Sequence, residues 1–210
     1  MSMTYEKRIP LLKDHHTHPS LYTSLNDSLD LRNVSGKAQA LELIRARDDE
    51  INVVFGWNNS LYSLLGRLKQ TKGVIPPLVR MEHCQFISEA NAHRARSLGM
   101  ILSMQPNFSS DSVQYRDRLS GKYCSRNNPF RMLIDTAGFT PGKDLIFGSD
   151  GMPHGVKYAL EMALFPPVPS QRLTLEEFIA GYCMDTQENG YIDIKVDEDK
   201  RTVLIRVVLK

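Results

Sequence analysis

The chain has 210 residues, of which 41% are hydrophobic and 24% are charged, and its 26 Lys and Arg against 24 Asp and Glu give a formal net charge of +2. These values are typical of a globular protein, so they exclude a disordered or collagen-like chain, and the balanced charge argues against nucleic-acid and membrane partners. Because no apolar run approaches the roughly 18 residues of a membrane span and no signal segment follows the charged start, we expect a cytoplasmic protein with reduced cysteines.

Short apolar runs alternate with helical patterns, which is typical of an α/β protein. In chain order, the pattern predicts a strand over 9–12, a helix over 36–47, a strand over 51–55, a weaker helix over 60–69, a strand over 78–82, a helix over 89–98, a strand over 100–104, a helix over 129–137, a strand over 145–147 and a helix over 155–164. Ser88 is the expected N-cap of the helix over 89–98, and Gly99 fits its C-terminal end.

The pattern changes after residue 165. Pro166-Pro167-Val168-Pro169 is a rigid break, so we divide the chain into residues 1–165 and residues 166–210. Thr174-Leu175-Glu176-Glu177 is a capping box that begins another helix. Two strands, 191–196 and 202–209, then flank a charged turn and predict an antiparallel hairpin. Since an isolated hairpin is marginal in water, it must pack on another part of the protein.

The strongest signal for chemistry is Asp14-His15-His16-Thr17-His18. If the apolar run before it is a strand, His16 and His18 point to the same face. Two imidazoles in this arrangement suit one divalent metal ion, and Asp14 could orient a ligand through a hydrogen bond or face the same way. The alternative explanation is a polar strand end with exposed histidines.

Two further candidates follow predicted strands. His83 comes after the strand over 78–82 and is either a third metal ligand or a hydrogen-bonded histidine at a strand end. Asp150 ends Gly148-Ser149-Asp150. It is a metal ligand, a general base or both, or else the N-cap of the next helix. Together these nitrogen and oxygen donors form the set that a hydrolytic metal site needs. Cys84 is expected to be a buried small residue rather than a nucleophile.

These segments, in this order, resemble the amidohydrolase superfamily, and most closely its YtcJ-like branch, amidohydrolase family 3. The matching motifs are Asp14-x-His16-x-His18, Gly56-Trp57-Asn58, Arg80-x-Glu82-His83-x-Gln85, Ser103-x-Gln105-Pro106 and Gly148-Ser149-Asp150-x-x-Pro153. The resemblance implies that His16, His18 and His83 are metal ligands and that Asp150 is both a ligand and the general base. It also implies hydrolysis of an amide, cyclic amide or N-acyl C–N bond in a small-molecule substrate, with His83 polarising the carbonyl oxygen if it is not a ligand.

The chain departs from this family in two places. Residues 57–78 are too few for barrel strands three, four and five, and the β-sandwich strands that usually precede the first motif are missing. Because strands four and five normally supply a lysine or carboxylate and a histidine, we expect a mononuclear site with zinc favoured over manganese, iron and nickel. The predicted fold class is α/β, as a partial or rearranged TIM-barrel-like fold with a small C-terminal β-hairpin.

There are two alternatives to this enzyme, the first suggested by the missing strands four and five and the second by the His-x-His motif, which also opens other metal-dependent barrels. The first is a catalytically degenerate relative that acts as a structural or interaction protein. The second is a metal-dependent phosphoesterase, which the absence of a glycine-rich phosphate loop makes less favourable. In each case an open remnant of a barrel would expose edge strands, and we therefore expect a homodimer or a tight, reorganised sheet.

Overall fold

The computed structural model describes residues 3–15, 38–39, 42, 52–54, 79–150, 155–182 and 189–210. The strands in these residues are β1 (Thr4–Pro10), β2 (Asn52–Val54), β3 (Val79–Glu82), β4 (Ile101–Met104), β5 (Leu145–Phe147), β6 (Gly190–Asp197) and β7 (Thr202–Leu209). The helices are α3 (Glu89–Ser97), α4 (Asp111–Gln114), α5 (Gly121–Ser125), α6 (Val156–Leu164) and α7 (Leu175–Tyr182), with the 3₁₀ helices η1 (Pro106–Ser110) and η3 (Pro169–Gln171) and the π-helical turn η2 (Met132–Thr136).

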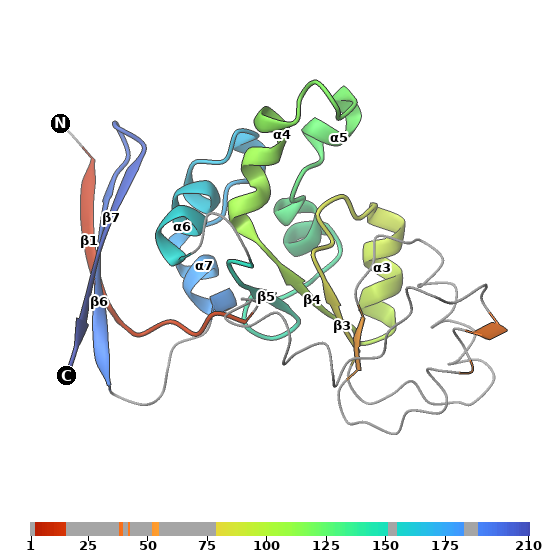
Figure 1. The fold of residues 1–210 in the computed structure, drawn as a ribbon, viewed down its shortest axis with the longest axis horizontal. Helices are drawn as coiled ribbons and strands as arrows, with labels where there is room; N and C mark the ends of the chain where they lie inside the picture. The colour runs from red at the N-terminus through yellow and green to blue at the C-terminus, as the bar shows by residue number, and fades with distance from the viewer. Residues whose placement is uncertain are drawn as a thin grey trace.

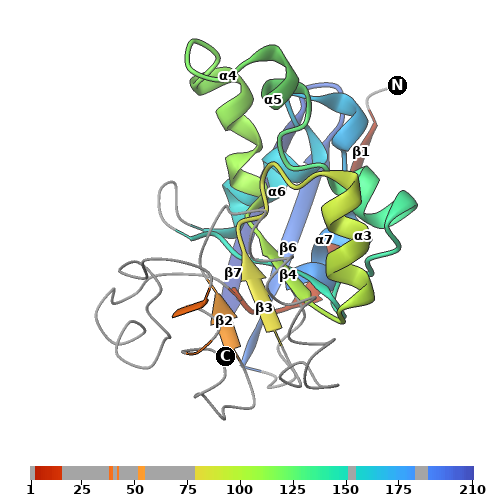
Figure 2. The same ribbon diagram turned by 90° about the vertical axis from the view of Figure 1, so that its right-hand side faces the viewer.

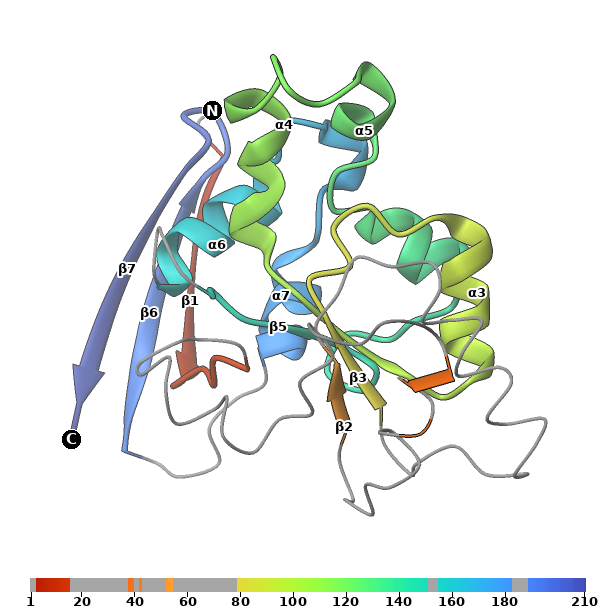
Figure 3. The same ribbon diagram turned by 45° about the vertical axis from the view of Figure 1, so that its right-hand side comes forward.

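The strands form two separate sheets. β2, β3, β4 and β5 are parallel and lie in that order, whereas β1, β6 and β7 form an antiparallel sheet in the order β1-β6-β7. Helices α6 and α7 lie between the two sheets, where α6 contacts β7 and α7 contacts β5 (Figures 1 and 3). Helix α3 connects β3 to β4 and runs alongside them (Figure 2).

The hydrophobic core surrounds the parallel sheet. Met81, Leu102, Met104 and Phe147 are all almost completely buried, which explains the apolar residues that the sequence places in these strands. The Phe147 ring on β5 contacts the rings of Phe130, Phe178 and Tyr182, with the nearest centroids 5.4 Å apart. Aromatic burial therefore joins β5 to α7.

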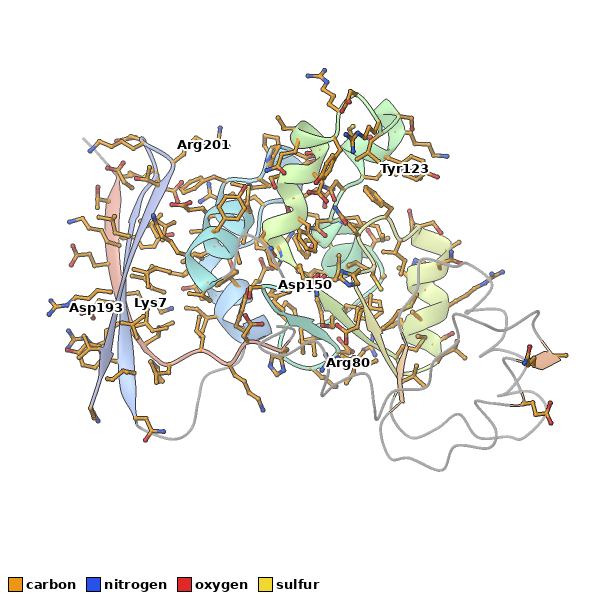
Figure 4. The ribbon with its side chains drawn as sticks, viewed as in Figure 1. Lys7, Arg80, Tyr123, Asp150, Asp193 and Arg201 are labelled. Carbon is orange, nitrogen blue, oxygen red and sulfur yellow. The ribbon has the colours of Figure 1, made fainter. Side chains whose placement is uncertain are left out.

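The antiparallel sheet has an apolar face and a charged face. Ile9 opposite Ile192, together with Ile194, Val196 and Val203, is buried. The other face carries exposed ion pairs between Arg8 and Asp193 and between Lys195 and Glu6, at 2.6 and 2.8 Å. Figure 4 shows Asp193 on this sheet. Because exposed ion pairs contribute little, burial of the apolar face is the main source of this sheet's stability.

The first strand differs from the prediction. Residues 9–12 are predicted as a barrel strand, whereas β1 covers Thr4–Pro10 and pairs with β6 of the hairpin along seven register positions. The β-sandwich strands that usually precede the first motif are expected to be missing, but the structure has one strand before Asp14, and this strand pairs with the C-terminal hairpin. The apolar signal at Ile9 reflects burial against Ile192, and the hairpin packs on β1 as its marginal stability requires. The boundary at residue 165 stays a prediction.

The parallel sheet is smaller than a TIM barrel. In the part of the chain that the structure describes it has four strands, and these do not close into a barrel. The α/β class is confirmed, as a mixed α/β fold with a short parallel sheet. A TIM barrel is not seen among the described residues. The predicted helix over 60–69 and most of that over 36–47 lie outside the described residues.

Several local predictions are confirmed by hydrogen bonds. Ser88 caps α3 by accepting a bond from Asn91 N at 3.3 Å, and Gly99 after it has a φ of 70°. Thr174 and Glu177 form the reciprocal bonds of a capping box at 2.8 and 3.1 Å. The helix predicted over 129–137 is present over 130–136, as Phe130 and Arg131 in α-helical conformation followed by the π-helical turn Met132–Thr136, and Gly138 after it has a φ of 78°. Among the described residues, no helix has the length and apolar character of a membrane span.

Candidate functional site

The site candidates lie at the carboxyl edge of the parallel sheet. His83 follows β3 and Asp150 follows shortly after β5, and parallel strands bring their carboxyl ends to one edge. His83 Nδ1 lies 3.8 Å from Asp150 Oδ2, and both side chains are partly exposed. Figure 4 shows Asp150 above the parallel strands. The structure thus brings together two of the four residues that the sequence singles out.

Both residues have an unusual backbone conformation. His83, Cys84 and Asp150 have φ values of 70°, 49° and 53°, in the left-handed region that residues other than glycine rarely adopt. Such a conformation costs about 1 kcal/mol or more per residue and persists only where surrounding contacts impose it. At β3 that contact is the bond from His83 N to Ser103 O at 2.8 Å.

Asp14 holds the turn that carries Asp150. Its carboxylate accepts hydrogen bonds from Ser149 N at 3.0 Å and from Ser149 Oγ at 2.6 Å. On the other side, Asn107 Nδ2 donates to Ser149 O at 2.9 Å. Ser149 is therefore fixed through its amide, its hydroxyl and its carbonyl. This contact is additional to the two roles that the sequence left open for Asp14, because its partner is Ser149, 135 positions away, and those roles stay predictions.

Arg80 and Glu82 attach the segment before His16 to β3. The guanidinium of Arg80 pairs through Nε with the carboxylate of Glu82, which is only 1% exposed, and donates through Nη2 to His15 O at 2.9 Å. His15 N in turn donates to Phe147 O at 3.2 Å. A two-residue spacing places Arg80 and Glu82 on one face of the strand, which is the signal that could have predicted this pair. Their contacts are structural, since a buried carboxylate needs a partner.

His15 itself has no role in the sequence prediction. Burial, together with the charges of Lys13 and Arg80, lowers the pKa of its imidazole, so the neutral form is favoured. Its Nε2 is buried and has no hydrogen-bond partner among the described residues. His16 and His18 follow it in the chain but lie outside the described residues.

Side-chain amides hold the loop next to His83. Asn127 and Asn128 donate to main-chain oxygens of the loop between β4 and α4, to Phe108 O at 2.8 Å and to Gln105 O at 2.9 Å. Gln85 donates to Phe108 O at 3.2 Å. These amides fix the η1 segment against the end of β3. The sequence does not mark Asn107, Asn127 or Asn128 as site residues, because an asparagine in a loop has no distinctive spacing.

A cavity of about 540 Å³ opens beside His83. Its lining residues come from the segment after β3, from η1, from α4 and from the segment after α4, and are His83, Gln85, Phe86, Phe108, Ser110, Asp111, Gln114, Tyr115, Arg118 and Leu119. The rings of His83 and Phe108 stack with centroids 6.2 Å apart and 18° between their planes. The volume is within the range of about 300–1,000 Å³ of small-molecule sites. A ligand in this cavity would contact the imidazole of His83.

The donor atoms present are compatible with part of a metal site. Two ligands of a tetrahedral zinc ion are separated by about 3.3 Å, which the distance of 3.8 Å between His83 Nδ1 and Asp150 Oδ2 approaches. Within the described ranges, no three or more His, Cys, Asp or Glu side chains are grouped closely enough to hold an ion. The pair therefore fits two ligand positions, and the roles of His16 and His18 stay predictions.

Comparison with known proteins supports the fold. No protein-family model and no curated protein sequence matches the chain. An uncharacterized metal-dependent hydrolase from Pyrococcus furiosus is similar in structure, with a TM-score of 0.53, 18% identity, and coverage of 71% of this chain and 31% of that one. An uncharacterized metal-dependent hydrolase from Pyrococcus horikoshii OT3 has a TM-score of 0.53, 14% identity, and coverage of 71% and 32%. The chain thus spans less than a third of the length of these proteins, and the likeness is one of fold.

Proposed function

We propose that this chain is a metal-dependent hydrolase that cleaves a C–N bond in an amide, a cyclic amide or an N-acyl group. The observation that carries the proposal is the His83–Asp150 pair, with atoms 3.8 Å apart, at the carboxyl edge of the parallel sheet and beside a cavity of about 540 Å³. The two similar structures belong to proteins described as metal-dependent hydrolases, which supports the reaction class. The choice of a C–N bond follows from the motif resemblance.

His83 and Asp150 would hold one divalent ion, with His16 and His18 as the further ligands that the sequence suggests. Such an ion, with zinc favoured, lowers the pKa of water to about 7 and so supplies a nucleophile at neutral pH. Asp150 is suited to accept the proton of that water and to return it to the leaving nitrogen, because a carboxylate beside the reacting atoms can act first as a base and then as an acid.

The surrounding residues keep this carboxylate in place. Asp14 and Asn107 hold Ser149 on both sides, so that Asp150 keeps its left-handed backbone conformation at a φ of 53°. The cavity beside His83 would hold the substrate against the pair. Positioning of this kind is valuable because displacement of a catalytic group by about 1 Å lowers a rate by about a hundredfold.

The test is metal content per chain. His83→Asn tolerates the left-handed backbone at this position, and His93→Asn on the exposed face of α3 is the matched control. We expect near-stoichiometric metal in the unaltered protein and in His93→Asn, and its loss in His83→Asn and in the double variant His16→Ala, His18→Ala. Unchanged metal content in His83→Asn would remove this residue from the site. Asp150→Asn should then abolish hydrolysis of N-acyl and cyclic amides.

A second candidate, a catalytically degenerate relative with a structural or interaction role, is favoured by one observation. Among the described residues, His83 and Asp150 are not joined by a third His, Cys, Asp or Glu close enough to share an ion. The same measurement separates the two candidates. Absence of metal after incubation with zinc or manganese would favour the degenerate relative, and its function would then be sought in binding partners.

A further inference from the structure

The cavity beside His83 has walls of mixed chemistry. Phe86, Phe108 and Tyr115 line it with aromatic rings, whereas Asp111 and Arg118 add one charge of each sign. Phe86 is itself supported by Tyr123 on α5, whose ring lies 5.5 Å away at 75° (Figure 4). An apolar wall with a few polar groups is typical of a site that binds one end of a small molecule.

Asp111 is the inner charge. Its side chain is half-buried, and its Oδ2 accepts a hydrogen bond from Gln85 Nε2 at 2.8 Å. Gln85 is itself buried and also bound to Phe108 O, so this amide is fixed. Among the described residues, no donor binds the other carboxylate oxygen, Oδ1, and burial raises the pKa of the carboxyl. A carboxylate in this situation gains from an additional N–H donor.

Arg118 is the outer charge and acts more weakly. Its side chain is 75% exposed, its guanidinium lies 5.6 Å from the Tyr115 ring, and its Nε lies 3.8 Å from Asp117 Oδ2. Solvent and salt screen such an exposed charge, and Asp117 offsets part of it. Because electrostatic interactions are stronger where the effective dielectric is lower, the half-buried Asp111 should act on a charged ligand more strongly than the exposed Arg118.

We propose that this cavity binds the amine-bearing end of the substrate, an aromatic or aliphatic group with a protonated nitrogen. Asp111 Oδ1 accepts the N–H bond, and the aromatic walls contact both the hydrocarbon part and the positive charge. The inference deepens the proposed function, on which it rests for the identity of the reacting end at His83. Binding in the cavity can be measured without any reaction.

The test compares three ligands of similar size on the full chain. These are phenethylammonium, 3-phenylpropionate and 2-phenylethanol, with dissociation constants measured by titration calorimetry or by ligand-detected NMR. We expect the ammonium ion to bind at least about tenfold more tightly than the carboxylate, because it adds a charge-assisted hydrogen bond. Asp111→Asn should remove that preference and leave the affinity for the alcohol unchanged.

Asp117→Asn is the matched control, since Asp117 is an exposed aspartate near the same cavity and should leave all three affinities unchanged. Arg118→Gln should leave ammonium binding unchanged or tighten it. Three results would overturn the proposal. The first is tighter binding of the carboxylate than of the ammonium ion, with this preference lost in Arg118→Gln. The others are full ammonium affinity in a folded Asp111→Asn and failure of all three ligands to bind. Ammonium binding without metal uptake would overturn the proposed function alone, whereas metal uptake with hydrolysis but no ammonium preference would overturn this inference alone.

Discussion

At the scale of single residues, the carboxylate of Asp14 binds a partner that is far away in the sequence. It binds both the amide and the hydroxyl of Ser149, 135 positions away, and so links the segment after β1 to the segment after β5. Bonds of this kind to a charged acceptor are shorter and stronger than neutral ones. Asp14 therefore acts on Asp150 through Ser149, as a positioning residue.

This contact predicts the effect of Asp14→Asn. The amide has one acceptor oxygen in place of two, so one of the bonds from Ser149 is lost and the other is weakened. We expect the free energy of unfolding to fall by about 1–2 kcal/mol, measured by chemical denaturation. Asp135→Asn, at an exposed position on η2, should change it by less than about 0.5 kcal/mol. Equal effects in the two variants would show that the bonds to Ser149 contribute little.

At the scale of elements, the contact of α7 with β5 determines the position of the sheet edge. Gly181 on α7 lies against the ring of Phe147, and a Cβ added there would be 2.1 Å from Phe147 Cδ2. Phe147 is completely buried and surrounded by Phe130, Phe178 and Tyr182, so its ring has little room to move. The glycine at this position is thus required by close packing between helix and strand.

Gly181→Ala should therefore destabilise the protein although alanine favours a helix. We expect a loss of about 1–3 kcal/mol from overpacking, partly offset by the gain of about 1 kcal/mol in helix propensity. In the control Gly121→Ala on α5, the added Cβ would meet no atom within 4 Å, and stability should stay constant or rise slightly. Thermal and chemical denaturation measure both. A stabilised Gly181→Ala would contradict the packing argument.

At the scale of the whole molecule, the two ends of the chain meet in one sheet. β1 lies antiparallel to β6, and the N- and C-termini lie on the same side of the molecule (Figure 1). β7 is an edge strand of this sheet, and its Leu204 and Leu209 are 62% and 72% exposed. An exposed apolar edge strand favours association with another chain.

The homodimer expected from the sequence stays a prediction at this scale. Light scattering at micromolar concentration should give twice the chain mass of 23.9 kDa, because pairing would cover apolar edge residues. Dilution by two orders of magnitude should then shift the mass towards that of one chain if the association is reversible. A mass of one chain at every concentration would contradict the prediction and leave the edge strands unpaired between molecules.

What the sequence by itself determined is local. Periodicity and capping depend on residues a few positions apart. They predicted the strands near residues 78–82, 100–104 and 145–147, the C-terminal hairpin, and the caps at Ser88 and Thr174. The meeting of His83 and Asp150 followed from the rule that parallel strands share a carboxyl edge.

Only the tertiary structure decided which distant segments meet. An apolar run such as that at Ile9 fits any complementary face. Its periodicity therefore could not distinguish a strand paired with Ile192 in an antiparallel sheet from a strand of a barrel. Likewise, the sequence around a carboxylate such as Asp14 or Asp111 does not indicate which residue it binds. Whether it binds a metal, a turn or a ligand depends on which donors packing brings within hydrogen-bond distance, and here those donors are Ser149 and Gln85.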